Sequence, residues 1–134
     1  MFYSIDIAVP RNTSFRAPIT TRVSVFPGLV KRVWIGFPDG CKGLVHVQVW
    51  YQGLPVWPWS PANSIHWNNF IYVIDDPFPL VAEPYEFVVK TWNRDYIYEH
   101  QIQFAVTIDP ARPEEEVANL SDILLDLGLI DRGQ

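Results

Sequence analysis

Hydrophobic and polar residues alternate along most of the first 108 residues, in short segments that end at Pro or Gly. Alternation with a period of two is typical of a β-strand that buries one face. The longest regular example covers residues 98–108, where Ile102, Phe104 and Val106 alternate with Gln103 and Ala105. Shorter examples predict further strands at residues 3–9, 19–25, 33–37, 44–51, 70–74 and 85–92.

Seven or eight strands spaced by roughly 8–12 residues are typical of a β-sandwich or a jelly roll. We therefore predict an all-β fold for residues 1–108, an antiparallel, jelly-roll-like β-sandwich of seven or eight strands. Residues 78–80 contain Pro79, which argues against a central strand. The predicted core gathers the inward-facing residues Val23, Val25, Val45, Val47, Ile102, Phe104 and Val106.

The pattern changes from Asp109 onward. Pro110 and Pro113 predict a stiff linker, and the three Glu residues that follow suit the first turn of a helix. Apolar residues then recur at helical spacing, so residues 109–134 are predicted to be a linker and an acidic, amphipathic docking helix. Because so short a helix is marginal alone in water, its stripe is expected to lie against its own sandwich or another chain. The stripe comprises Val117, Leu120, Ile123, Leu124 and Leu127.

The charge follows the same division. Residues 1–108 hold 8 Lys or Arg and 8 Asp or Glu, whereas residues 109–134 hold 2 and 7, so the net charge of −5 lies in the tail. A neutral body with an acidic tail lacks the basic footprint of a nucleic-acid-binding protein. No segment approaches the roughly 20 apolar residues of a membrane span, and the N-terminus does not resemble a signal peptide. We expect no nucleic-acid or membrane partner, and synthesis in the cytoplasm.

Candidate chemistry is sparse. Spacings of HxH or HxxxH, which would suggest a metal site, are absent among the histidines His46, His66 and His100. Pairs of Asp such as Asp75 and Asp76 are more common in a turn than in a catalytic site, and Ser60 and Ser64 lack a nucleophile signature. We therefore predict no catalytic residue, metal or cofactor, and a protein that is not an enzyme.

Aromatic residues are abundant, at 15% of the chain with 6 Trp. Three of them, Trp57, Trp59 and Trp67, lie within eleven residues in a Pro-rich segment. Rigid exposed aromatic rings stack on sugars or bury at protein interfaces. We predict that these three residues bind a partner. The alternatives are that the loop caps the open end of the sandwich or that it forms a ligand platform.

Residues 38–47, 84–87, 92–95 and 99–100 read PDGCKGLVHV, PYEF, WNRD and EH. In these segments the body, about residues 1–108, resembles small β-sandwich proteins of viral and phage gene neighbourhoods. The general type is similar to the head-decoration, cement and tail-adaptor proteins of tailed phages, which share no diagnostic motif that would assign a role to a single residue.

The resemblance implies a structural virion protein, made in the host cytoplasm. Such a subunit would form a homo-oligomer or dock on a capsid or tail protein, through the aromatic loop and the C-terminal tail. The main alternative is a carbohydrate-binding module that holds a glycan with its loop tryptophans. A third hypothesis is a small hydrolase of an unrecognised type.

Overall fold

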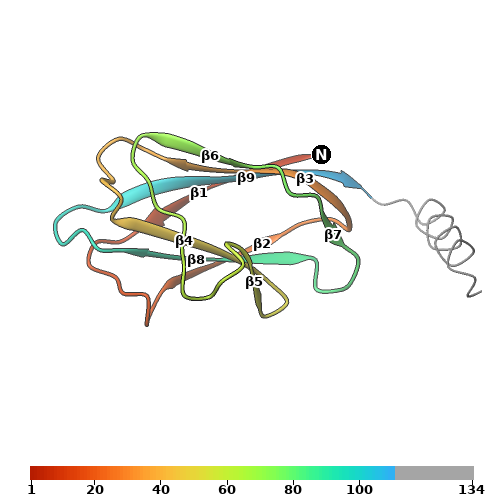
Figure 1. The fold of residues 1–134 in the computed structure, drawn as a ribbon, viewed down its shortest axis with the longest axis horizontal. Helices are drawn as coiled ribbons and strands as arrows, with labels where there is room; N and C mark the ends of the chain where they lie inside the picture. Colours follow the sequence, from red (N-terminus) through yellow and green to blue (C-terminus); the bar gives the residue numbers. More distant parts are fainter. Residues whose placement is uncertain (111–134) are drawn as a thin grey trace, which may run out of the picture.

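The computed structural model describes residues 1–110, which form two antiparallel β-sheets packed face to face (Figure 1). One sheet has the order β1-β9-β3-β6, and the short strand β7 also pairs with β3. The other sheet has the order β2-β8-β4-β5. The strands are β1 (Phe2–Val9), β2 (Ile19–Ser24), β3 (Gly28–Phe37), β4 (Val45–Tyr51), β5 (Leu54–Trp57), β6 (Phe70–Ile74), β7 (Phe78–Leu80), β8 (Glu86–Asn93) and β9 (His100–Pro110).

The prediction of an all-β fold with antiparallel strands is confirmed. The described part of the chain has nine strands where seven or eight were expected, because the short segments β5 and β7 also pair. β9 continues to Pro110, two residues beyond the predicted end of the body at residue 108. Residues 1–110 contain no helix, and so none long and apolar enough to cross a membrane. The predicted C-terminal helix, with its stripe from Val117 to Leu127, lies outside the described residues.

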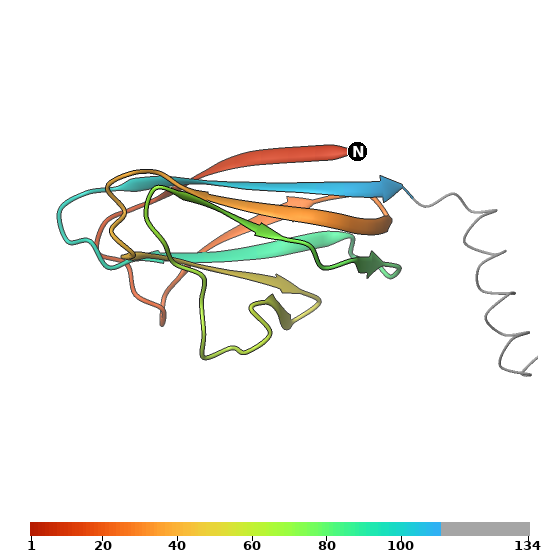
Figure 2. The ribbon, with the colours of Figure 1, turned by 45° about the horizontal axis from the view of Figure 1, so that its top comes forward.

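The strands pair in a nested order. β1 pairs with β9, β2 with β8, β3 with β6, and β4 with β5. Lateral pairing of β3 with β9 and of β4 with β8 then completes the two sheets, whose layering is visible in Figure 2. The innermost hairpin, β4–β5, turns at Gln52 and Gly53, with φ angles of 49° and 77°. Two successive positive φ angles are those of a type I′ turn, which suits the twist of a hairpin.

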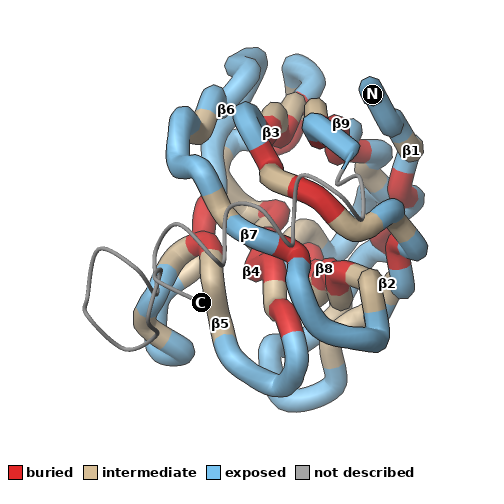
Figure 3. Tube along the Cα trace, turned by 90° about the vertical axis from the view of Figure 1, so that its right-hand side faces the viewer, coloured by how far each residue is buried: buried red, intermediate tan, exposed pale blue. Residues whose placement is uncertain are grey.

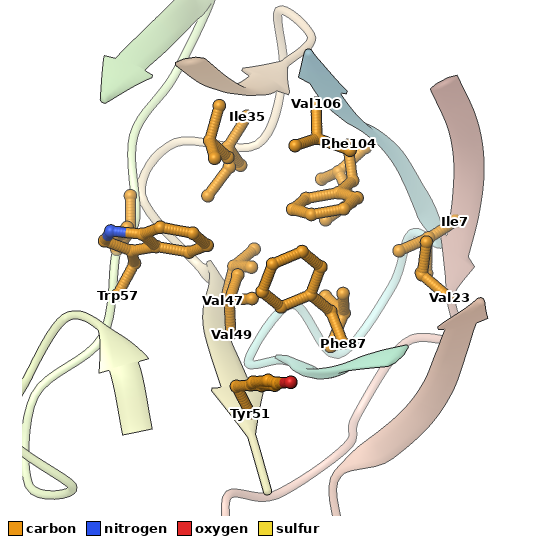
Figure 4. Close-up of a cluster of buried hydrophobic side chains, with 14 of the residues drawn as sticks. Ile7, Val23, Ile35, Val47, Val49, Tyr51, Trp57, Phe87, Phe104 and Val106 are labelled. Carbon is orange, nitrogen blue, oxygen red and sulfur yellow. The ribbon is translucent and has the colours of Figure 1, made fainter. Parts of the chain in front are cut away.

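Alternating residues of both sheets meet in one core (Figure 4). Phe104 of β9 and Phe87 of β8 face each other across the sandwich, with ring centroids 6.2 Å apart. Of the seven residues predicted for the core, six are buried and Val25 is half-buried against the cluster. The period-two pattern therefore identified the inward face of β2, β4 and β9.

Candidate interaction surface

Residues 58–69 link β5 in one sheet to β6 in the other, and hydrogen bonds fix this segment to the sandwich. Gln48 Nε2 on β4 donates to the carbonyl oxygens of Pro61 and Asn63, at 3.0 and 2.7 Å. Val47 and Ile65 exchange two backbone hydrogen bonds of 2.9 Å, as in a short antiparallel bridge. The aromatic loop is thus held in place by β4.

Trp57 belongs to the core of the sandwich. Its side chain is 4% exposed, packs against Phe78 and Phe87 with centroids 5.7 and 5.5 Å apart, and donates from Nε1 to Asp76 Oδ2 at 3.0 Å. Figure 4 shows its ring directed into the cluster of buried side chains. The structure therefore buries Trp57, because β5 ends at this residue with its side chain turned inward, and its role in binding a partner stays a prediction.

Trp59 and Trp67 remain at the surface, 76% and 51% exposed. Trp67 packs against Phe70 with ring centroids 5.4 Å apart, and Phe70 lies 6.4 Å from Tyr72. A row of three partly exposed aromatic rings therefore runs from the end of the loop along β6. The role of Trp59 and Trp67 in binding a partner stays a prediction.

β6 is an edge strand in which every residue is apolar. Phe70, Ile71, Tyr72 and Val73 are 46%, 60%, 37% and 46% exposed, so neither face of the strand is buried. In Figure 3, β6 lies at a corner of the sandwich and is coloured exposed over most of its length. Its inward face is left uncovered because β5, the strand at the corresponding edge of the other sheet, pairs only with Val49–Tyr51 of β4. We call Trp67, Phe70, Ile71, Tyr72 and Val73 the β6 surface.

The sequence pattern predicted a strand at residues 70–74 but did not predict an exposed interaction surface there. A run of consecutive apolar residues usually indicates a strand buried on both faces. Here the same run, residues 70–74, lies at a sheet edge. The sequence held one signal for an exposed strand: large apolar residues occupy both odd and even positions, and Asp75 and Asp76 follow at once.

The apolar surface continues onto the outer face of the first sheet. A hollow there is lined by Phe2, Trp34, Gly36, Ile71 and Gln103, among others. The rings of Phe2 and Trp34 meet edge to face, 5.7 Å apart. Gly36 also lines this hollow, and a Cβ at its position would lie 3.5 Å from the Gln103 side chain. Apolar groups therefore extend from the edge at β6 towards β1.

The structure brings His46, His66 and Ser64 together, which their spacing in the sequence did not indicate. His46 Nδ1 lies 2.7 Å from Ser64 Oγ, and its ring lies 4.5 Å from the His66 ring and stacks on Trp92 at 5.2 Å. Loss of solvent, followed by the nearby His66 and the Arg94 guanidinium, lowers the pKa of His46 to about 4. A serine nucleophile needs a base that a third group orients, and no hydrogen bond within residues 1–110 joins His46 to a carboxylate.

We expect the stability of the protein to fall as the pH is lowered from about 6.5 to about 4. An unfolded His46 gains its proton near pH 6.5, whereas the folded one gains it only near pH 4, so protons favour the unfolded state in this window. His46→Gln should flatten the dependence of the melting temperature on pH in that range. NMR titration of the His46 ring checks the cause directly, and a midpoint near 6.5 in the folded protein would contradict it.

Asp95 also pairs with a histidine, in the 94–99 turn. His100 Nε2 lies 2.9 Å from Asp95 Oδ2, while the backbone N–H groups of Ile97 and Tyr98 donate to Asp95 Oδ1. His100 first, and then these two amides, lower the pKa of Asp95 to about 2. Residues 94–99 therefore form a turn that is fastened by a His–Asp pair. Within residues 1–110, no three His, Cys, Asp or Glu residues lie close enough together to hold a metal ion.

No protein-family model, curated protein or solved structure matches this chain. Function is therefore inferred from the surfaces and the strand order described above. The strongest of these features is the β6 surface, since large apolar groups rarely gather in the open without a partner.

Proposed function

We propose that this protein is a non-enzymatic assembly subunit, an accessory protein of a virion that associates with further copies of itself or with a capsid or tail protein. The observation that carries the proposal is the β6 surface. It combines an open sheet edge with five neighbouring apolar side chains, each at least 37% exposed. Such a surface is costly to leave in water and is suited to association.

The nested strand order supports the same function. With β7 set aside as an addition to the edge of β3, the pairs β1·β9, β2·β8, β3·β6 and β4·β5 support our proposal of an eight-stranded jelly roll. Jelly rolls build viral capsid and lectin domains. Because a fold hosts many functions, this likeness supports the virion proposal and its carbohydrate-binding alternative alike.

Each of the polar pairs in the described chain has a structural role. This favours a protein that catalyses no reaction. Ser64 and His46 join the aromatic loop to β4, and Asp95 and His100 fasten the 94–99 turn. Asp76, considered as part of a carboxylate pair, accepts the hydrogen bond of the buried Trp57. Each pair holds two segments of the chain together.

Carbohydrate binding is the second candidate, and Trp59 and Trp67 favour it. Both rings are more than half exposed on a loop that is already fixed to the sandwich, so little ordering would be needed to stack them on a sugar. A glycan array separates the two functions when it is read beside sedimentation. A strictly monomeric protein that binds glycans would favour this second candidate.

We expect Trp59→Ala combined with Trp67→Ala to weaken self-association at least about tenfold while leaving the melting temperature nearly unchanged. Both side chains are largely exposed, so their loss removes contact area and no core packing. Tyr96→Ala is the matched control, because Tyr96 is 74% exposed in the turn between β8 and β9. Sedimentation velocity over a range of concentrations measures the effect. Unchanged association in the double variant would contradict a role for the loop.

The C-terminal tail is proposed to supply a second contact through its apolar stripe. Leu120→Asp with Leu124→Asp is expected to weaken assembly, because it places charge in a stripe whose burial is worth roughly 1.5–3 kcal/mol per side chain. Asn119→Asp with Ser121→Asp adds the same charge at positions off the stripe and serves as the control. Equal sedimentation of the two variants would mean that the stripe does not bind.

A further inference from the structure

We propose that β6 pairs with β6 of a second copy of this chain. The two strands would run antiparallel about a two-fold axis at Tyr72 and join the two β1-β9-β3-β6 sheets into one. This inference rests on the proposed function, since it names the partner of the β6 surface. Such an interface is isologous: the same residues contribute from both copies.

β6 is the least protected of the sheet edges in the described chain. Proteins blunt open edges with charges, Pro, bulges or very short strands. β1 carries Asp6 and β2 carries Arg22, while β5 and β7 contain Pro55 and Pro79 and are only 4 and 3 residues long. β6 has five residues without charge, Pro or register shift. Apart from its pairing with β3, no hydrogen bond of residues 1–110 involves the backbone of β6.

The sequence of β6 is complementary to itself when it pairs about Tyr72. Ile71 then lies opposite Val73 of the second copy on the outer face of the joined sheet. On the inner face Phe70 lies opposite Ile74, and the two Tyr72 rings meet at the axis. Pairs of aromatic and β-branched residues are among the most favourable cross-strand neighbours. The strand has no charged or amide side chain, so the only polar side-chain group that the pairing would cover is the Tyr72 hydroxyl.

The polar residues that flank the two ends of β6 favour the same antiparallel orientation. In this antiparallel arrangement, the end of β6 that is followed by Asp75 and Asp76 lies near the end of the second copy's β6 that is preceded by Asn68 and Asn69. Asn68 already accepts hydrogen bonds through Oδ1 from the backbone of Gly40 and Lys42, so its amide NH₂ remains to donate. The acidic end of each strand therefore meets an amide, and the carboxylates of the two copies stay apart. A parallel pairing would instead set Asp75 and Asp76 beside their own counterparts.

The area available indicates a weak dimer. Trp67, Phe70 and Tyr72 are 51%, 46% and 37% exposed. With aromatic side chains that bury about 150–250 Å² each, they offer roughly 300 Å² per copy. A standard stable interface buries about 800 Å² per partner. We therefore expect association in the micromolar to millimolar range, with β6 pairing as one contact among several in an assembly.

Charge substitutions at the two facing positions test the register directly. In Ile71→Lys with Val73→Lys, each lysine lies opposite a lysine of the second copy. In Ile71→Glu with Val73→Glu, glutamates oppose each other in the same way. Each double variant alone should self-associate at least about tenfold more weakly than the parent protein, and an equimolar mixture should associate again. Both positions are at least 46% exposed, so far-UV spectra and melting temperatures should stay close to those of the parent.

Sedimentation equilibrium of the full chain measures each outcome. Recovery in the mixture alone supports the pairing. A parent protein that stays monomeric at millimolar concentration overturns it, as does a lysine variant that associates like the parent or a mixture that fails to recover. If the mixture fails to recover and the charge variants also lose their assembly on a larger particle, then β6 pairs with a strand of a foreign protein instead.

The proposed function and the β6 pairing can fail separately. If the parent associates through Trp59 and Trp67 while the charge variants change nothing, the pairing fails and the assembly function stands. If mixing the charge variants restores a dimer that binds glycans through Trp59, the pairing stands and the assembly function fails.

Discussion

Trp57→Ala is expected to lower the free energy of unfolding by about 3–5 kcal/mol, whereas Trp59→Ala should change it by less than about 0.5 kcal/mol. The two residues are separated only by Pro58, yet their side chains are 4% and 76% exposed. Removing the Trp57 ring would open a cavity beside Phe78 and Phe87 and leave Asp76 without its indole donor. Removing the Trp59 ring takes away only surface.

Urea denaturation monitored by circular dichroism measures both changes. Trp57→Phe is a useful intermediate, because it keeps much of the ring volume and loses the Nε1 donor; it should fall between the parent and Trp57→Ala. A destabilising Trp59→Ala would show that the whole loop serves as a cap. A neutral Trp57→Ala would mean that the core closes without this residue.

The strands and most of the core could be predicted because they follow from local alternation. In β9, Ile102, Phe104 and Val106 are buried while Gln101 and Gln103 are exposed, as a period of two requires. The turn after β3 is equally local: Gly40 at the end of Pro38-Asp39-Gly40 has a φ of 102°, which glycine adopts without a steric penalty.

The candidate surfaces could not be predicted in the same way, because they depend on which strands lie at the edges. The apolar pattern of residues 70–74 would be the same at the edge of a sheet as in its centre. These residues form a surface because β6 pairs with β3 on one side and has no neighbouring strand on the other. Trp57 and Trp59 would share a face if the strand continued, but β5 ends at Trp57. The contact of His46 with Ser64 joins residues 18 positions apart, through the path of a loop.

Asn93, at the end of β8, is buried and bonds to three other segments of the chain. Its Nδ2 donates to the carbonyl oxygens of Val9 and Tyr98, at 3.3 and 2.9 Å, and its Oδ1 accepts from the N–H of Asp95 at 2.9 Å. Its backbone N–H donates to Thr13 Oγ1 at 2.7 Å. With a residue exposure of 0%, its amide is satisfied by the protein alone. It ties the end of β8 to β1 and to both neighbouring loops.

Asn93→Asp is expected to destabilise the protein by about 3–5 kcal/mol at pH 7, the usual loss for a buried charge without a partner. The new carboxylate has the shape of the amide but would turn an oxygen towards two carbonyl oxygens. Asn63→Asp is the matched control, because Asn63 is exposed and, within residues 1–110, forms hydrogen bonds only through its backbone N–H and carbonyl oxygen. That variant should stay within about 0.5 kcal/mol of the parent.

The difference in the free energy of unfolding between Asn93→Asp and the parent should depend on pH, and this dependence tests whether the buried charge is the cause of the loss. Burial beside carbonyl oxygens should raise the pKa of the introduced carboxyl in the folded state above its unfolded value of about 3.9. The folded variant then holds its proton at a pH where the unfolded chain has lost it, so its deficit is largest at neutral pH. As the pH falls towards 4, the deficit relative to the parent should shrink, because the protonated acid can donate to one of the two carbonyls. A deficit that stays constant between pH 7 and pH 4 would point instead to altered packing, since a steric effect does not titrate.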